Sequence, residues 1–104
     1  MKRLGFKMKL LPGNKEEYKK RHSDVWPDLV ALLKSQGIHN YSIFLDEETN
    51  TLFAYQEQSG LNSSQDLGDN EIVKKWWEYM KDIMETNPDN SPLTLPLEQV
   101  FFMK

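Results

Sequence analysis

The sequence predicts an α+β fold whose strands and helices follow the order βαββαβ. Two observations support this prediction. Runs of alternating, β-branched or aromatic residues occur near both ends and in the middle of the chain, and two longer segments repeat apolar residues at helical spacing. The chain has 104 residues and no cysteine, so we expect one domain, residues 1–104, built around one core without disulfides.

The composition limits the classes of function. The formal net charge is −3 and the pI is about 5.3, which disfavours binding to a nucleic-acid backbone. Without cysteine, thiolate metal sites and thiol catalysis are excluded. The chain has no apolar run near the ~18 residues of a membrane span, and residues 1–11 alternate charged with apolar types, unlike a signal peptide. We therefore expect a soluble, cytoplasmic protein.

The first strand and a helical arm come from the N-terminal third. Residues 3–10 alternate apolar side chains with charged ones or glycine, which predicts a strand with one buried face. A turn follows, and Asn14 is placed to cap a helix. We expect one helical arm over residues 14–36, bent or broken near residues 23–26, because Pro27 suits the first turn of a new helical stretch.

The middle of the chain predicts a hairpin. Residues 38–45 and 51–57 are rich in β-branched and aromatic types. The polar residues 46–50 join them and supply the loop. Residues 58–70 carry Ser, Gly, Asn and Asp and are interpreted as a connection, with one helical turn around Gln65.

The last third predicts a second helix and a final strand. From Asn70 as far as Met84, apolar residues recur every three or four positions, which indicates a strongly amphipathic helix. Two prolines within residues 87–92 end that helix. Residues 95–103 supply the fourth strand.

This order is typical of a ferredoxin-like fold, an antiparallel four-stranded sheet with both helices on one face. Apolar residues fall on both sides of the middle and last strands, as Phe44 and Phe101 illustrate. The face without helices would therefore be apolar and bare. Large exposed apolar patches rarely persist on monomers, so we expect a homodimer.

One histidine is a candidate for proton transfer. Tyr18 and His22 are four positions apart and share a helix face, and histidine is the side chain best suited to exchange protons near neutral pH. A lone histidine at a helix end is also commonly a surface residue or a partner of the helix dipole. For His39, which lies in the predicted hairpin with Tyr41, we favour a structural role.

The Trp76-Trp77 pair suggests a ligand site beside the core. Adjacent helix positions point about 100° apart, so one ring can pack in the core while the other lines a cavity. Aromatic rings stack on the C–H faces of sugars, although core packing plus a dimer contact explains the pair equally well. The other candidates are Tyr41, Trp26, Asp24 and the loop 87–92. This residue mix, with no metal triad, phosphate loop or nucleophile elbow, suits a small neutral polar ligand.

Several blocks of the sequence resemble the L-rhamnose mutarotase family. The blocks are Arg21-His22-x-x-x-Trp26-Pro27-x-Leu29, Leu33-Lys34-Ser35-x-Gly37-x-His39-Asn40-Tyr41-x-Ile43-x-Leu45-Asp46, Trp76-Trp77-x-Tyr79-Met80 and Asn87-Pro88-Asp89-Asn90-Ser91-Pro92. They are long and rich in rare residue types. The resemblance covers nearly the whole chain and is poorest over residues 58–70.

The resemblance implies a dimeric α/β-barrel made of two ferredoxin-like subunits, and interconversion of the α and β anomers of L-rhamnose. It implies that His22 is the proton donor and that Tyr18, Tyr41, Trp76 and Trp77 contact the sugar. No cofactor and no metal are expected from the family.

The chemistry leaves one role open. Anomers exchange when the ring oxygen gains a proton and the anomeric hydroxyl loses one, and the base could be Asp24, a tyrosine or a water molecule. Two other functions would use the same pocket. One is a different small dimeric-barrel enzyme, a monooxygenase or isomerase acting on an aromatic substrate. The other is a non-catalytic sugar-binding module.

Overall fold

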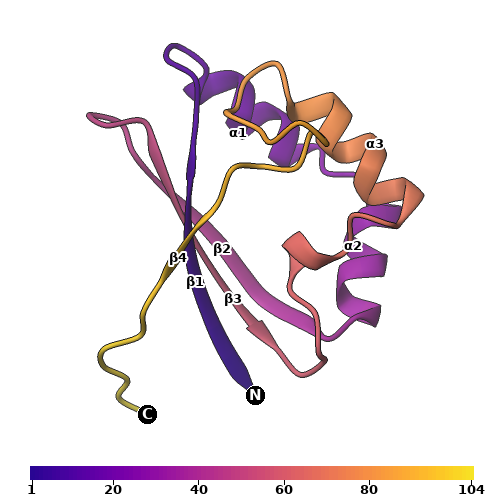
Figure 1. The fold of residues 1–104 in the computed structure, drawn as a ribbon, viewed down its shortest axis with the longest axis vertical. Coiled ribbons are helices and arrows are strands. Elements are labelled where there is room, and N and C mark those ends of the chain that lie inside the picture. Colours follow the sequence, from indigo (N-terminus) through magenta and orange to yellow (C-terminus); the bar gives the residue numbers. More distant parts are fainter.

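The computed structural model describes all of residues 1–104 and contains a four-stranded antiparallel sheet with the helices gathered on one side of it (Figure 1). The strands are β1 (Lys2–Lys9), β2 (Ile38–Asp46), β3 (Thr51–Gln58) and β4 (Leu95–Leu97). Their order in the sheet is β2-β3-β1-β4. This is the order of a ferredoxin-like sheet, and the predicted fold class is confirmed.

The helices number three rather than the expected two, besides a 3₁₀ turn. The three helices are α1 (Lys15–Ser23), α2 (Pro27–Ser35) and α3 (Glu71–Met80), and the 3₁₀ turn is η1 (Ser64–Asp66). The helical arm breaks where the sequence indicated, because Trp26 is extended, with φ −62° and ψ 128°, ahead of Pro27. Asn14 precedes α1 without capping it, since its amide donates back to the carbonyl oxygens of Leu11 and Pro12.

Two predicted element ends were wrong. α3 stops at Met80, four residues short of Met84, because the chain turns there and Met84 forms an antiparallel bridge with Leu10. Met84 is still buried in the core. It therefore fits the helical spacing of apolar residues although it lies in a turn. The last strand is also shorter than residues 95–103. Beyond Leu97 the chain leaves the edge of β1.

The core lies between the sheet and the helices. Its larger cluster consists of Phe6, Met8, Leu10, Tyr18, Leu52, Ala54, Met80, Ile83 and Met84. A smaller cluster of Leu29, Val73 and Trp77 joins α2 to α3. Trp76 packs against both clusters, so α3 holds the two parts of the core together.

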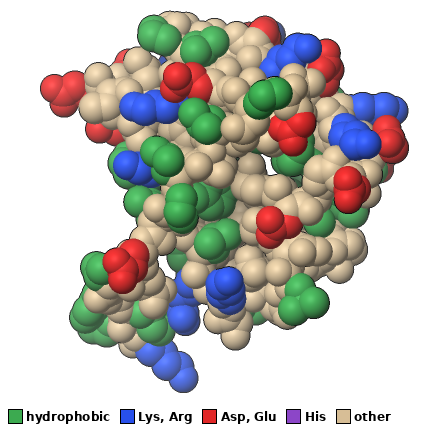
Figure 2. All heavy atoms as spheres, in the orientation of Figure 1, with side chains coloured by type: hydrophobic (Ala, Val, Ile, Leu, Met, Phe, Trp, Pro, Cys, Tyr) green, Lys and Arg blue, Asp and Glu red, His purple; other side chains and the backbone are tan.

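The opposite face of the sheet is open and partly apolar. Phe44 and Phe53 pair across β2 and β3, with 68% and 38% of their surface exposed. Leu95 and Leu97 are also exposed on this face, on β4, beyond Gly5 and Lys7 of β1. Figure 2 shows further hydrophobic side chains gathered on the C-terminal segment at the lower left, where Phe102 lies under the Arg3 guanidinium at 3.4 Å. None of the helices combines the length and apolar character needed to cross a bilayer.

Candidate active site

His22 lies in the last turn of α1 and is half-buried. Its Nδ1 atom is 3.0 Å from the carbonyl oxygen of Tyr18. A carbonyl oxygen can only accept, so Nδ1 carries the proton and donates it. Nε2 is then the ring atom left for proton transfer. Burial lowers the pKa of His22 from its ordinary value, and the hydrogen bond to Tyr18 opposes that shift only in part. The imidazole is therefore mainly neutral at pH 7.

Aromatic rings enclose this imidazole. The Tyr18 ring stacks on it, with 4.2 Å between centroids and an angle of 27°. Trp76 of α3 meets it edge-on at 5.4 Å and 89°. Behind Trp76, Trp26 packs edge-on at 5.1 Å and stacks on Tyr79. The structure thus brings together three of the predicted site residues, Tyr18, His22 and Trp76, from two helices.

Arg21 fixes the position of α1 against the end of α3. Its guanidinium donates to Asp82 Oδ1 at 2.8 Å, to the Tyr79 carbonyl at 2.7 Å and to Glu17 Oε2 at 2.7 Å. It also lies over the Tyr79 ring at 4.6 Å. Because Arg21 precedes His22, these bonds hold the imidazole beside Trp76. Residue-level reasoning from the sequence gave Arg21 no role.

The two tyrosines of the site are protonated phenols near neutral pH. Burial raises the pKa of Tyr18 well above its usual range, and the nearby Tyr41 raises it further. Burial also raises the pKa of Tyr41, against a hydrogen bond from Ser64 that lowers it. Phenols in this state donate hydrogen bonds and do not accept a proton. Of the three candidate bases, Asp24 and water therefore remain.

A buried polar group next to Tyr41 was missed by the sequence analysis, which treated residues 58–70 as a connection. Gln56 of β3 is fully buried and bonds twice to Ser64 of η1. Ser64 in turn lies 3.5 Å from the Tyr41 hydroxyl. A signal existed, because Gln56 and Gln58 occupy the same inward positions of β3 as Leu52 and Ala54. Polar residues in a buried alternation indicate a hydrogen-bonded network.

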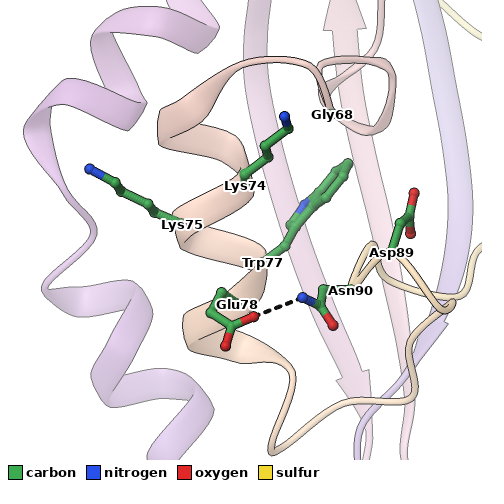
Figure 3. A pocket seen from close by; sticks show the side chains of 7 residues that line it. All are labelled: Gly68, Lys74, Lys75, Trp77, Glu78, Asp89 and Asn90. Carbon is green, nitrogen blue, oxygen red and sulfur yellow. Dashed lines mark hydrogen bonds between the residues drawn. The ribbon is translucent and has the colours of Figure 1, made fainter.

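Trp77 lies apart from His22. Only 6% of its surface is exposed, and it packs with Leu29 and Val73. Figure 3 shows its ring lying close to Gly68, where an added Cβ would stand 3.0 Å from the indole. Trp77 lines an open cleft of about 430 Å³ together with Gly68, Lys74, Lys75, Glu78, Asp89 and Asn90.

The remaining candidates lie at the surface. Asp24 is exposed directly after α1, and His39 is exposed on β2. In the loop 87–92, Asn90 donates to Glu78 Oε2 at 2.7 Å, so the loop is tied to α3 beside Trp77 (Figure 3). No three His, Asp or Glu side chains gather closely enough to hold a metal ion.

Comparisons with known proteins identify the family. The family model described as L-rhamnose mutarotase matches residues 3–103. The chain belongs to the L-rhamnose mutarotase family. The resemblance seen in the sequence blocks is thereby confirmed. Mutarotases are isomerases, which accords with a site that contains one proton-transfer group and aromatic walls.

Individual members of the L-rhamnose mutarotase family match over their full length. An L-rhamnose mutarotase of Formosa agariphila is 62% identical over 104 residues, all of both chains. One of Bacteroides thetaiotaomicron is 59% identical and covers 99% of each chain. The crystal structure of an L-rhamnose mutarotase from Formosa agariphila superposes with a TM-score of 0.93 at 60% identity, covering all of both chains. The fold is therefore that of this family.

Proposed function

We propose that this chain is an L-rhamnose mutarotase that interconverts the α and β pyranose anomers of the sugar. The observation that carries the proposal is identity of about 60% to L-rhamnose mutarotases over the full length of the chain. The His22 site supports it, because its single proton-transfer group and its aromatic walls suit a small uncharged sugar.

In the proposed reaction, His22 acts through Nε2. The imidazolium form gives a proton to the ring oxygen while the anomeric hydroxyl gives one to the base, Asp24 or a water molecule, and the ring opens. The C1–C2 bond then rotates, and ring closure reverses the proton movements. Because the uncatalysed reaction already proceeds in water, acid–base catalysis of about 10²–10⁴-fold is a sufficient contribution.

Four aromatic residues are proposed to contact the sugar. Tyr18 and Trp76 are supported by their contacts with the His22 ring. Tyr41 is supported by its place near Tyr18 on the inner face of β2. For Trp77 the support is the family resemblance alone, because its ring packs on Gly68 and faces the other cleft.

The first test measures anomer exchange of L-rhamnose by NMR saturation transfer. We expect the protein to raise the exchange rate well above that of buffer, and heat-denatured protein to have no effect. Sugar binding with exchange at the buffer rate would instead identify a sugar-binding module. Absence of both effects would remove L-rhamnose as the ligand.

We also propose that two chains pair through the open face of the sheet. Phe44 and Phe53 form an apolar centre there, and Leu95 and Leu97 extend it. Exposed apolar side chains of this kind on one face of a sheet are typical of a protein interface. Two such sheets packed face to face would form the α/β-barrel that the family resemblance implies. The expected cytoplasmic location stays a prediction.

Charge placed on this face should separate the subunits. We expect sedimentation equilibrium to give the dimer mass for the unchanged protein, and Phe44→Glu to weaken association at least tenfold because a carboxylate would be buried unpaired. The matched control is Leu61→Glu, since Leu61 is 97% exposed and lies outside the sheet. A monomer mass for the unchanged protein at micromolar concentration would contradict the proposal.

A further inference from the structure

We propose that Ser64, oriented by the buried Gln56, sets the direction of hydrogen bonding at Tyr41 so that Tyr41 donates its hydroxyl proton to an oxygen of the bound sugar. Ser64 is thus a positioning residue that acts through Tyr41. The inference rests on the proposed function, because it takes Tyr41 to contact the substrate.

A β-bulge brings Tyr41 to this place. His39 pairs with Glu57 and Ser42 pairs with Tyr55, so Asn40 and Tyr41 both lie opposite Gln56. Asn40 adopts a left-handed conformation with φ 48°, which asparagine tolerates better than most residues. The extra residue turns Tyr41 toward the helices, whereas strict alternation from Ile38 would turn it outward.

The orientation of the Gln56 amide follows from one unambiguous donor. The backbone N–H of Ser64 lies 2.9 Å from Gln56 Oε1, and only the oxygen of the amide can accept it. The Gln56 nitrogen is then directed at Ser64 Oγ, at 2.8 Å. Gln56 therefore donates to the Ser64 hydroxyl, and both atoms of its amide are engaged with η1.

The Ser64 hydroxyl is in turn directed to donate its proton to Tyr41. Its oxygen accepts from Gln56 and also from Gln65 Nε2 at 3.1 Å. Both lone pairs are then used, and the single hydroxyl proton remains for the Tyr41 oxygen at 3.5 Å. Tyr41 accepts at its oxygen, so its own proton is available to another acceptor.

The acceptor that fits is a sugar oxygen with a free lone pair, either a hydroxyl or the ring oxygen. A hydroxyl that accepts one hydrogen bond becomes a better donor in the next, because the chain polarises. Burial keeps Tyr41 in its phenol form, as its raised pKa indicates. The connection between β3 and α3 thereby serves the site through Ser64.

Enzyme kinetics test the inference with Ser64→Ala, Tyr41→Phe and the double variant. Losing one neutral hydrogen bond changes an equilibrium by between about twofold and tenfold. We expect Ser64→Ala to reduce kcat/KM by that factor in the unchanged background and to have no further effect in Tyr41→Phe. The matched control is Ser63→Ala, which removes the hydroxyl that caps η1 without touching Tyr41. An equal loss with and without the Tyr41 hydroxyl would overturn the inference.

A spectroscopic measurement separates this inference from the proposed function. In protein labelled with ¹³C at tyrosine Cζ, the Tyr41 signal is identified by its absence in Tyr41→Phe. We expect Ser64→Ala to shift this signal and Ser63→Ala to leave it in place. If Ser64→Ala shifts the Tyr41 signal but the protein does not accelerate anomer exchange, the hydrogen bond from Ser64 to Tyr41 is supported and the mutarotase proposal is rejected. An unmoved signal in an active protein would overturn the role of Ser64 alone.

Discussion

Replacing His22 with alanine is expected to slow anomer exchange by about 10²–10⁴-fold, the usual contribution of a positioned acid–base group. Sugar affinity should change much less, because the walls formed by Tyr18 and Trp76 remain. Saturation transfer gives the rate, and titration calorimetry gives the affinity. His39→Ala is the matched control, since His39 is exposed on β2. Equal losses in the two variants, or none in His22→Ala, would remove His22 from the mechanism.

The pH dependence should show which form of His22 acts. Its pKa lies below the ordinary value of about 6.5, so the imidazolium becomes abundant only in mildly acidic solution. If the charged form donates to the ring oxygen, the enzymatic rate above buffer rises as the pH falls through this lowered pKa. A rate that instead rises with pH to a plateau would identify neutral Nε2 as the base. The His39→Ala profile should match that of the unchanged protein.

The second large effect is on stability, at Leu52. Leu52 is 1% exposed and lies on β3, an inner strand of the sheet. It pairs with Met8 of β1 on one side and with Leu45 of β2 on the other. We expect Leu52→Ala to reduce the free energy of unfolding by about 2–5 kcal/mol, because it removes buried methyl groups and leaves a cavity. Urea unfolding at one fixed protein concentration measures this, since association also affects stability.

The control for Leu52 is Leu61→Ala, the same substitution at a position that is 97% exposed. Its unfolding free energy should stay within about 0.5 kcal/mol of that of the unchanged protein. Similar losses for both variants would show that the inner face of β3 is not the main source of stability.

The fold was largely predictable because the periodicities are strong. Alternation in residues 3–10 and the helical spacing after Asn70 each reflect burial of one face. The errors came from apolar residues that lie outside regular elements. Met84 is buried in a turn that pairs with Leu10, and residues after 97 are apolar without joining the sheet.

The candidate site was predictable only where helical spacing was enough. Tyr18 and His22 are one turn apart, so their shared face followed directly from the sequence. The link from Tyr41 to Ser64 and Gln56 depends on a bulge and on a contact 23 residues apart in the chain. No local pattern encodes such a contact. Helix geometry indicated that Trp76 and Trp77 point in different directions, but not which ring would face His22.

The bulge at Asn40 makes the pairing register of β2 as important as its composition. If Asn40 were drawn into the ladder opposite Gln56, with no residue lost, strict alternation would return and the two faces of the strand after residue 40 would exchange. Tyr41 would then turn toward the open face of the sheet, and Phe44 would turn toward the helices. A point substitution alters one side chain, whereas this shift of register would alter the pocket and the apolar outer surface together. Insertions or deletions in the loop 46–50 would not exchange the faces of β2, so we expect natural variation in length in that loop.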